Sequence, residues 1–247
     1  PAGIVTLLEK NMVANYKGLL GHRRYSLDIL ARIRDFRTLV NLSFVVYLSK
    51  KIGISTPLDP VLSFPLGPNA VSVMEAAIAY ETLLTGRIYP LSSDGDETMV
   101  PIITKIEDRK GKVIYAYQPR PKRVLSEPVC NLIGEILKKV MTWGTGRKAR
   151  DAVTVYDVRV PTYGKTGTAN RYTNSSFVGM VPGLDRTSGN PALEDGYVIA
   201  SYVGYDDNRP MKGKHISIYG SAGALPLWID TANAIVTADN YRKGLEP

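Results

Sequence analysis

The residues with the clearest chemical potential lie at positions 163–170, where the chain reads Tyr-Gly-Lys-Thr-Gly-Thr-Ala-Asn. In an extended strand the side chains alternate between two faces, so Thr166 and Thr168 would point to the same side. Two hydroxyl donors beside the ammonium of Lys165 would form a cradle for a carboxylate, such as the free C-terminus of a peptide. Gly167 has no Cβ and would let a ligand backbone come close. For these four residues alone, an exposed edge strand with a solvated lysine is an equally good interpretation.

Other blocks of sequence on both sides of this segment bear on the choice. Two apolar runs follow it, at residues 174–182 and 196–207, and each ends at turn residues, which is typical of buried strands. A Gly-Thr-Gly triplet precedes it at residues 144–146, and a Gly- and Ala-rich turn with Pro-x-Trp follows at residues 220–228. Further upstream, residues 66–80 form a Leu-Gly turn followed by an Ala-rich helical stretch.

In this order, the blocks resemble the transpeptidase domain of class A penicillin-binding proteins, strongly from Leu66 onward and weakly before it. The resemblance implies a β-lactamase/transpeptidase-like α/β fold, acyl transfer on the D-Ala-D-Ala stem peptides of peptidoglycan, and capture by β-lactams. No cofactor and no metal are expected. It also implies that Lys165 supports the proton network and that Thr166, Gly167 and Thr168 hold the substrate. The backbone N–H of Thr168 would help to form an oxyanion hole.

The nucleophile that this family places on a helix is not found in the sequence. In the family, a serine is followed three residues later by a lysine that lies on the same helix face and can accept the hydroxyl proton. No serine here has a lysine at that spacing. We expect the nucleophile to lie in sequence before Pro1, so that residues 1–247 form one transpeptidase-like domain that is incomplete at its N-terminus.

A second active-site line of the family, Ser-x-Asn, would fall close to Gly53. Asn41 can fill the asparagine position as a catalytic residue, but Leu39 then stands in the serine position and cannot shuttle a proton. Spacing back from Gly53 would instead put Leu42 in the asparagine position. An asparagine that only caps or packs in a helix is an equal alternative for Asn41.

Composition indicates a folded domain and excludes several kinds of site. The chain has 31 basic and 23 acidic residues and a net charge of +8, which favours anionic partners at long range. Its basic clusters are not interleaved with aromatic residues, so no nucleic-acid partner is expected. His22, His215 and the single Cys130 cannot form a zinc site or an internal disulfide. There is no apolar run of eighteen residues, so no membrane span is expected within this sequence. The resemblance implies a location that is periplasmic or at the extracytoplasmic face of the bacterial inner membrane, with an anchor in sequence outside this chain.

The spacing of apolar and turn residues predicts helices on a mainly antiparallel sheet, a layered α/β arrangement. A polar loop is expected at residues 92–97. The predicted elements are helices at 26–34, 40–51, 71–84, 129–141 and 225–238, a hairpin of 100–107 and 112–117 around the turn 108–111, and strands from 163 to about 205.

Three functions remain open. The first is a D,D-transpeptidase whose partners are stem peptides, β-lactams, the missing N-terminal part and a preceding glycosyltransferase domain. The second is a non-catalytic relative that binds peptidoglycan or a partner, which the altered position at Leu39 favours. The third is a basic interaction module that has kept the fold and uses its charge.

Overall fold

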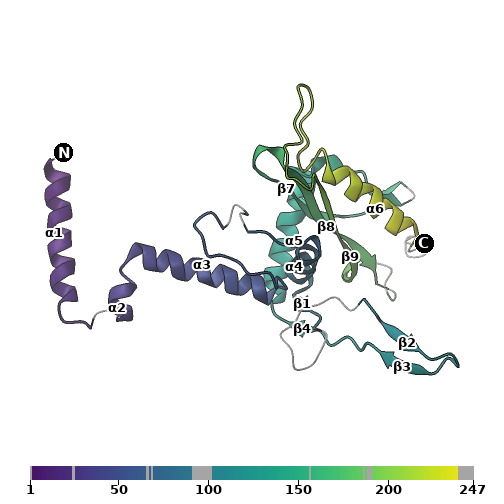
Figure 1. The fold of residues 1–247 in the computed structure, drawn as a ribbon, viewed down its shortest axis with the longest axis horizontal. Coiled ribbons are helices and arrows are strands. Elements are labelled where there is room, and N and C mark those ends of the chain that lie inside the picture. Colours follow the sequence, from purple (N-terminus) through teal and green to yellow (C-terminus); the bar gives the residue numbers. More distant parts are fainter. Residues whose placement is uncertain are drawn as a thin grey trace. The chain divides into compact units, whose positions relative to one another are not determined.

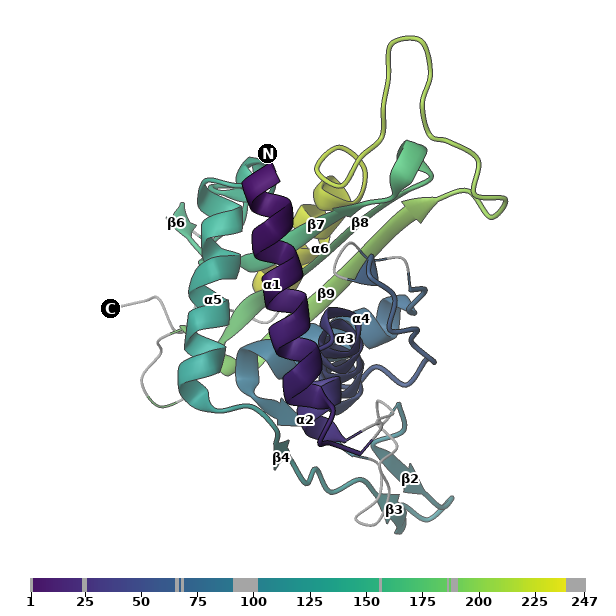
Figure 2. The ribbon, with the colours of Figure 1, turned by 90° about the vertical axis from the view of Figure 1, so that its left-hand side faces the viewer.

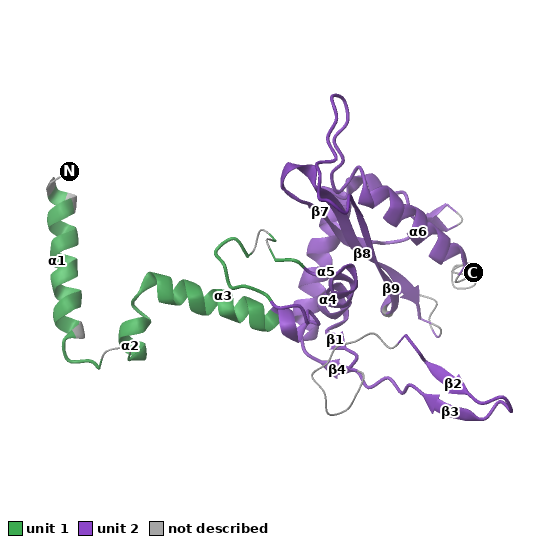
Figure 3. Cartoon of the chain, viewed as in Figure 1, with its two compact units in different colours: residues 1–48, 58–70 green, residues 49–57, 71–247 purple. Residues whose placement is uncertain are grey.

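The computed structural model describes residues 2–23, 26–64, 67, 69–90, 102–155, 157–185, 187 and 191–238 (Figure 1). The chain divides into two compact units (Figure 3). Unit 1 comprises Pro1–Leu48 and Leu58–Ala70, and unit 2 comprises Ser49–Pro57 and Val71–Pro247. The predicted loop at 92–97 lies outside the described residues. The expectation of one domain over residues 1–247 stays a prediction.

Unit 1 is built from helices. They are α1 (Ala2–Leu19), α2 (Leu27–Leu30) and α3 (Arg34–Lys51), the last of which ends in unit 2. The prediction of a helix over 26–34 was wrong, because α2 stops after four residues and the chain turns before α3 begins. The prediction that the next helix starts at residue 40 was also wrong. Residues 34–39 are mostly polar or charged and gave no apolar spacing, although Asp35 in the first turn favours helix initiation there.

The helix α3 ends in unit 2 and is followed by Gly53, as predicted. The N–H of Gly53 donates to the carbonyl of Lys50 at 3.1 Å, and its φ of 109° lies in the region that favours glycine. The helix α4 (Val73–Thr85) follows and ends at Gly86, with φ 73°. The prediction of 71–84 is thus confirmed to within two residues.

A carboxylate holds the segment after Gly53 to the start of α4. Glu75 is only 7% exposed, and its oxygens accept hydrogen bonds from the backbone N–H groups of Ser55, Thr56 and Ser72 at 2.6–2.8 Å. The hydroxyls of Ser55 and Thr56 also donate to it at 2.8 and 2.9 Å. The hydroxyl of Ser72 in turn accepts the N–H of Glu75, which completes a capping box. Burial alone would raise the pKa of Glu75, but these hydrogen bonds hold it well below its usual range.

Short antiparallel strand pairs lie along the chain between α4 and the central sheet. The predicted hairpin is confirmed with shorter strands, and its turn contains Gly111 at φ 79° and the carboxylate of Asp108, which accepts the N–H groups of Lys110 and Lys112. The pairs are β1 (Arg87–Ile88) with β4 (Lys122–Arg123), β2 (Lys105–Glu107) with β3 (Val113–Ala116), and β5 (Thr154–Val155) with β6 (Val158–Arg159).

A three-stranded antiparallel sheet forms the centre of unit 2. Its order is β7 (Tyr163–Thr168), β8 (Asn174–Leu184) and β9 (Pro191–Gly204). The helices that cover it are α5 (Glu127–Thr142) and α6 (Ala224–Ala238), which begin within two residues of the predicted positions. Figures 1 and 2 show α4 and α5 on one face of the sheet and α6 on the other. The predicted mainly antiparallel sheet between helices is therefore confirmed.

Successive side chains of β8 point to opposite faces of the sheet, and helices cover both faces because apolar residues lie on each. Met180 packs with Leu84 of α4 and Leu137 of α5, whereas Phe177 belongs to the cluster that includes Trp228 of α6. The rings of Phe177 and Trp228 meet edge to face, with centroids 5.0 Å apart. The Trp228 Nε1–H donates to the carbonyls of Ile199 at 3.2 Å and Gly179 at 3.4 Å. This packing fixes the sheet between α6 and α5.

Candidate functional site

The strand β7 carries the predicted site residues and lies at one edge of its sheet. In an antiparallel pair, successive residues turn their backbone groups alternately toward and away from the partner strand. The N–H of Ala169 donates to the carbonyl of Asn174 at 3.2 Å, which fixes this alternation. The backbone N–H and C=O groups of Gly164, Thr166 and Thr168 therefore point away from β8.

Lys165 reaches around this strand edge to its neighbour. Its Nζ donates to the backbone carbonyl of Thr166 at 2.7 Å and lies 3.5 Å from the Thr166 hydroxyl. By strand alternation the side chain of Lys165 starts on the face opposite to that of Thr166. The ammonium and the hydroxyl therefore come together at the edge of β7, and not on one face of it.

The hydroxyl of Thr166 has a second partner from another element. Thr145 lies in the Gly-Thr-Gly turn that follows α5, and its Oγ1 is 2.5 Å from the Oγ1 of Thr166. The sequence places these two residues 21 positions apart. The fold joins them because α5 runs along β7.

The hydroxyl of Thr168 is held by the turn before α6. The backbone N–H of Gly220 donates to the Oγ1 of Thr168 at 2.9 Å. A Cβ on Gly220 would lie 2.8 Å from both the Cβ of Thr166 and the carbonyl oxygen of Gly167, so only glycine fits against β7 here. Thr166 and Thr168 thus share the face that Gly220 covers, as the alternation of a strand requires.

Gly167 faces the neighbouring strand. A Cβ at this position would overlap with the Oγ of Ser176, the residue paired with it on β8. The close approach that glycine permits here is therefore used by Ser176 within the sheet. The predicted contact of Gly167 with a substrate backbone stays a prediction.

Beyond Thr168 the chain makes a short turn with unusual backbone angles. The 3-10 helix η3 (Asn170–Tyr172) contains Arg171 and Tyr172, both with φ 59°. The carbonyl of Tyr172 accepts the N–H of Met211 at 2.8 Å, and the Nζ of Lys212 lies 5.7 Å from the centre of the Tyr172 ring. Residues with positive φ cost free energy and are often found beside functional sites. Here they bring the segment after β9 next to the end of β7.

The residues predicted for the second active-site line belong to unit 1. Asn41 is an exposed residue of α3, and Leu39 on the same helix is 50% exposed. The catalytic role expected for Asn41 stays a prediction.

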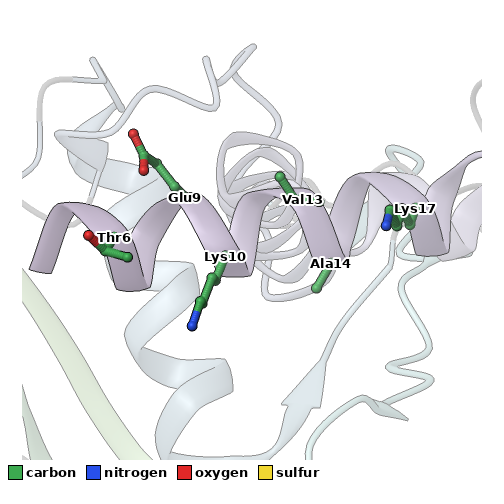
Figure 4. A pocket seen from close by; sticks show the side chains of 6 residues that line it. All are labelled: Thr6, Glu9, Lys10, Val13, Ala14 and Lys17. Carbon is green, nitrogen blue, oxygen red and sulfur yellow. The ribbon is translucent and has the colours of Figure 1, made fainter. Parts of the chain in front are cut away.

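A shallow depression lies along α1, but it offers no convergent groups. Every residue that lines it belongs to this one helix and is exposed, and the side chains spread outward from the helix axis (Figure 4). Its lining consists of Thr6, Glu9, Lys10, Val13, Ala14 and Lys17.

Within the described part of the chain, no three His, Cys, Asp or Glu side chains come together as a metal site would need. The helices of that part also include none with the length and apolarity that crossing a membrane requires.

The blocks containing Thr145 and Gly220 are visible in the sequence, but no pattern there indicates a role for either residue. The Gly-Thr-Gly triplet and the glycine-rich turn before Pro226 were used only as members of an ordered series of sequence blocks. Their distances from β7 depend on how α5 and α6 pack on the sheet, which local spacing does not contain. The site therefore has two partners that come from helix ends.

Comparison with known proteins places these features in a family. A sequence profile described as "Penicillin binding protein transpeptidase domain" matches residues 60–188. Penicillin-binding protein 1A of Aquifex aeolicus is 31% identical over 192 residues, which is 77% of this chain and 22% of that protein. Penicillin-binding protein 1A of Rickettsia typhi is 28% identical over 219 residues, with 79% and 24% covered. The chain thus spans less than a quarter of the length of these relatives.

A solved structure is also similar. The D,D-transpeptidase domain of a peptidoglycan glycosyltransferase from Eggerthella lenta shares 17% identity at a TM-score of 0.49, over 79% of this chain and 48% of that one. The family assignment does not depend on this similarity, because the sequence profile alone covers more than half of the 247 residues. The resemblance seen in the motifs is confirmed, and the chain belongs to the penicillin-binding protein transpeptidase domain family.

Proposed function

We propose that this chain forms the substrate-binding part of a peptidoglycan D,D-transpeptidase. The observation that carries the proposal is the arrangement at the edge of β7, where Lys165 and the hydroxyls of Thr166 and Thr168 lie together. The carboxylate that ends a stem peptide accepts hydrogen bonds only, and this edge supplies an ammonium and two hydroxyl donors. The outward N–H of Thr168 adds a backbone donor for the carbonyl that is attacked.

The proposed transpeptidation has two steps, acylation of the serine and transfer of the acyl group to an amine. A serine oxygen forms an ester with the carbonyl carbon of the penultimate D-Ala, and the terminal D-Ala leaves as an amine that takes up the serine proton. An amine from a second stem peptide then attacks the ester, which forms the new peptide bond and returns a proton to the serine. A β-lactam would be opened by the same serine and remain attached as an ester.

The transpeptidase reaction also needs the nucleophilic serine and its lysine, and no serine in these 247 residues has a lysine three positions later. We propose that they lie upstream of Pro1, that Asn41 contributes to the proton network, and that a glycosyltransferase domain precedes the transpeptidase in the same protein. We also propose that the chain acts at the extracytoplasmic face of the inner membrane.

The test is covalent labelling with a fluorescent penicillin, read by gel and by intact mass. The 247-residue chain and the full-length product of its gene are compared. We expect one acyl group per full-length molecule and none on the chain alone. If the full-length protein takes no label, the transpeptidase proposal fails.

Two lysine variants of the full-length protein make the test specific for β7. Lys165→Ala removes the cation at the strand edge and is expected to slow acylation about 100-fold, the size of effect seen when one transition-state donor is lost. Lys110→Ala removes another exposed cation, from the hairpin turn, and is expected to leave the rate unchanged. Equal rates for both variants would contradict the role of Lys165.

A non-catalytic relative that binds peptidoglycan is the second candidate, because Leu39 stands where the family pattern has a serine. This candidate predicts that the full-length protein binds D-Ala-D-Ala peptides without ever forming an ester. Peptide binding with no increase in mass after incubation with penicillin would favour it over the transpeptidase.

A further inference from the structure

The hydroxyls of Thr145 and Thr166 are hydrogen-bonded, and which of them donates decides which one can donate to a ligand. Each threonine hydroxyl has one proton and two lone pairs. The two oxygens are 2.5 Å apart, so one proton lies between them, and either hydroxyl could supply it. The remaining proton of the pair is free to point elsewhere.

The turn that carries Thr145 is tightly fixed to the end of α5. The N–H groups of Gly144 and Gly146 both donate to the carbonyl of Val140 at 3.1 Å. A Cβ on Gly144 would lie 2.9 Å from the Cα of Val140, and one on Gly146 would lie 2.8 Å from the Sδ of Met141. Neither glycine can be replaced without a shift, so the turn presents the hydroxyl of Thr145 from a fixed backbone.

The two threonines of β7 differ in how their protons are directed. The oxygen of Thr168 accepts the N–H of Gly220, so its own proton can turn outward to a ligand. The oxygen of Thr166 lies 3.5 Å from the Lys165 ammonium, too far for a strong hydrogen bond. Its proton turns outward only if Thr145 donates the proton that lies between the two hydroxyls.

We propose that Thr145 is a positioning residue that donates its hydroxyl proton to Thr166 and so directs the Thr166 proton to the carboxylate of the ligand. This inference rests on the proposed function, because it assumes that a carboxylate binds at β7. An ionised carboxylate is an acceptor only, so it selects the arrangement in which both threonines donate. A terminal carboxamide also carries donors and gains less from two outward protons. Thr145 therefore contributes to the preference for a free C-terminus.

The experiment measures binding of two peptides to the full chain by NMR titration of the β7 amides. Both end in D-Ala-D-Ala, one with a free carboxylate and one with a carboxamide. The wild-type chain is expected to prefer the carboxylate. Thr145→Val keeps the shape without the hydroxyl and is expected to weaken carboxylate binding about fivefold, the worth of one net hydrogen bond. Carboxamide binding should change less than twofold. Thr145→Ser should restore the preference, and Thr145→Ala is used if the valine variant does not fold.

Thr142→Val is the matched control, because its hydroxyl donates to the carbonyl of Lys138 within its own helix. It should leave both affinities unchanged. If Thr166→Val abolishes the carboxylate preference and Thr145→Val keeps it, the role of Thr145 is overturned while the proposed function stands. A loss of preference in Thr145→Ser as well would also overturn it, because the hydroxyl would not be the cause. If the wild type shows no preference, both proposals fail.

Discussion

Gly220 shows how a single residue without a side chain can organise a site. Its N–H holds the hydroxyl of Thr168, and its α-carbon lies against the backbone of β7. A larger residue would have to push away either Thr166 or Gly167, and both belong to the candidate site. Gly220 therefore supplies both the N–H that binds Thr168 and the space that β7 needs.

Replacing Gly220 with alanine should damage both binding and stability. The added Cβ would lie 2.8 Å from two atoms of β7, and relieving such overpacking costs about 1–3 kcal/mol. We expect a lower urea midpoint and weaker binding of the carboxylate peptide. Gly213→Ala is the control in the same connection, because its nearest neighbour would be 4.0 Å away. Equal stability of the two variants would show that Gly220 does not need to be glycine.

The sequence predicted the residues of β7 better than their partners. Thr166 and Thr168 fall two positions apart in a strand, and strand geometry alone puts them on one face. Thr145 and Gly220 approach them through helix packing, over 21 and 52 positions of sequence. Lys165 was expected beside the threonines, but its hydrogen bond to the carbonyl of Thr166 depends on β7 being an edge strand.

At the scale of elements, Trp228 is one of the buried residues that attach α6 to the sheet. The side chain is fully buried, meets the ring of Phe177, and donates to carbonyls on both β8 and β9. This helix begins just after Gly220, so its attachment also locates the turn that contacts Thr168.

Trp228→Phe should therefore destabilise unit 2. Phenylalanine keeps an aromatic ring but leaves the carbonyls of Gly179 and Ile199 without the indole donor, at a cost of about 1–3 kcal/mol. Urea unfolding followed by circular dichroism would measure the change. The matched control is Trp143→Phe, since Trp143 is 77% exposed and should change stability by less than about 0.5 kcal/mol. Similar losses in both variants would contradict the role of Trp228.

The carboxylate of Glu75 is the second element-scale connection, and it makes stability depend on pH. Its pKa is depressed in the folded state, so its contribution is present above the unfolded value of 4.5 and is lost as the pH falls. Glu75→Gln should cost about 1–3 kcal/mol at pH 7, because an amide cannot satisfy all the donors around it. The difference between wild type and variant should shrink below pH 4.5.

Thermal unfolding at a series of pH values would measure this difference. Glu135→Gln is the control, because the side chain of Glu135 is 63% exposed and lies 3.9 Å from Lys138. It should have little effect at any pH. A constant gap between wild type and Glu75→Gln down to pH 3 would contradict the depressed pKa.

Element predictions succeeded where caps and periodicity agreed. Ser72, Glu75 and Gly86 mark both ends of α4, and the helix was found to within two residues. The break between α2 and α3 was predicted at residues 35–39 but lies at residues 31–33, which contain no glycine or proline to mark a turn. The small pairs β1–β4 and β5–β6 join strands of only two residues, which are too short to have a period.

At the scale of the whole molecule, the two units differ in how many of their apolar side chains are buried. Unit 2 contains two apolar clusters around β8. In unit 1, every described side chain of α1 is exposed, including Leu7, Met12 and Tyr16. Most helix stability in proteins comes from the packing of an apolar face, and α1 buries none of its described side chains.

Hydrogen exchange should therefore divide the chain by unit. Amides of α1 are expected to exchange in seconds, whereas those of β8 and α6 should open only with global unfolding. Exchange followed by mass spectrometry of peptides would show this pattern. Protection of α1 equal to that of β8 would contradict it.

The single thiol of the chain makes another kind of experiment available. Cys130 on α5 is 3% exposed, and a Cβ on Gly86 would lie 3.0 Å from its sulfur, so it is enclosed where α4 ends. Burial also raises the pKa of the Cys130 thiol, which keeps it unreactive in the closed state. Alkylation would therefore need the two helices to separate. The rate at which an added thiol reagent modifies Cys130 in the native protein would then report how often α4 and α5 separate, without any engineered probe.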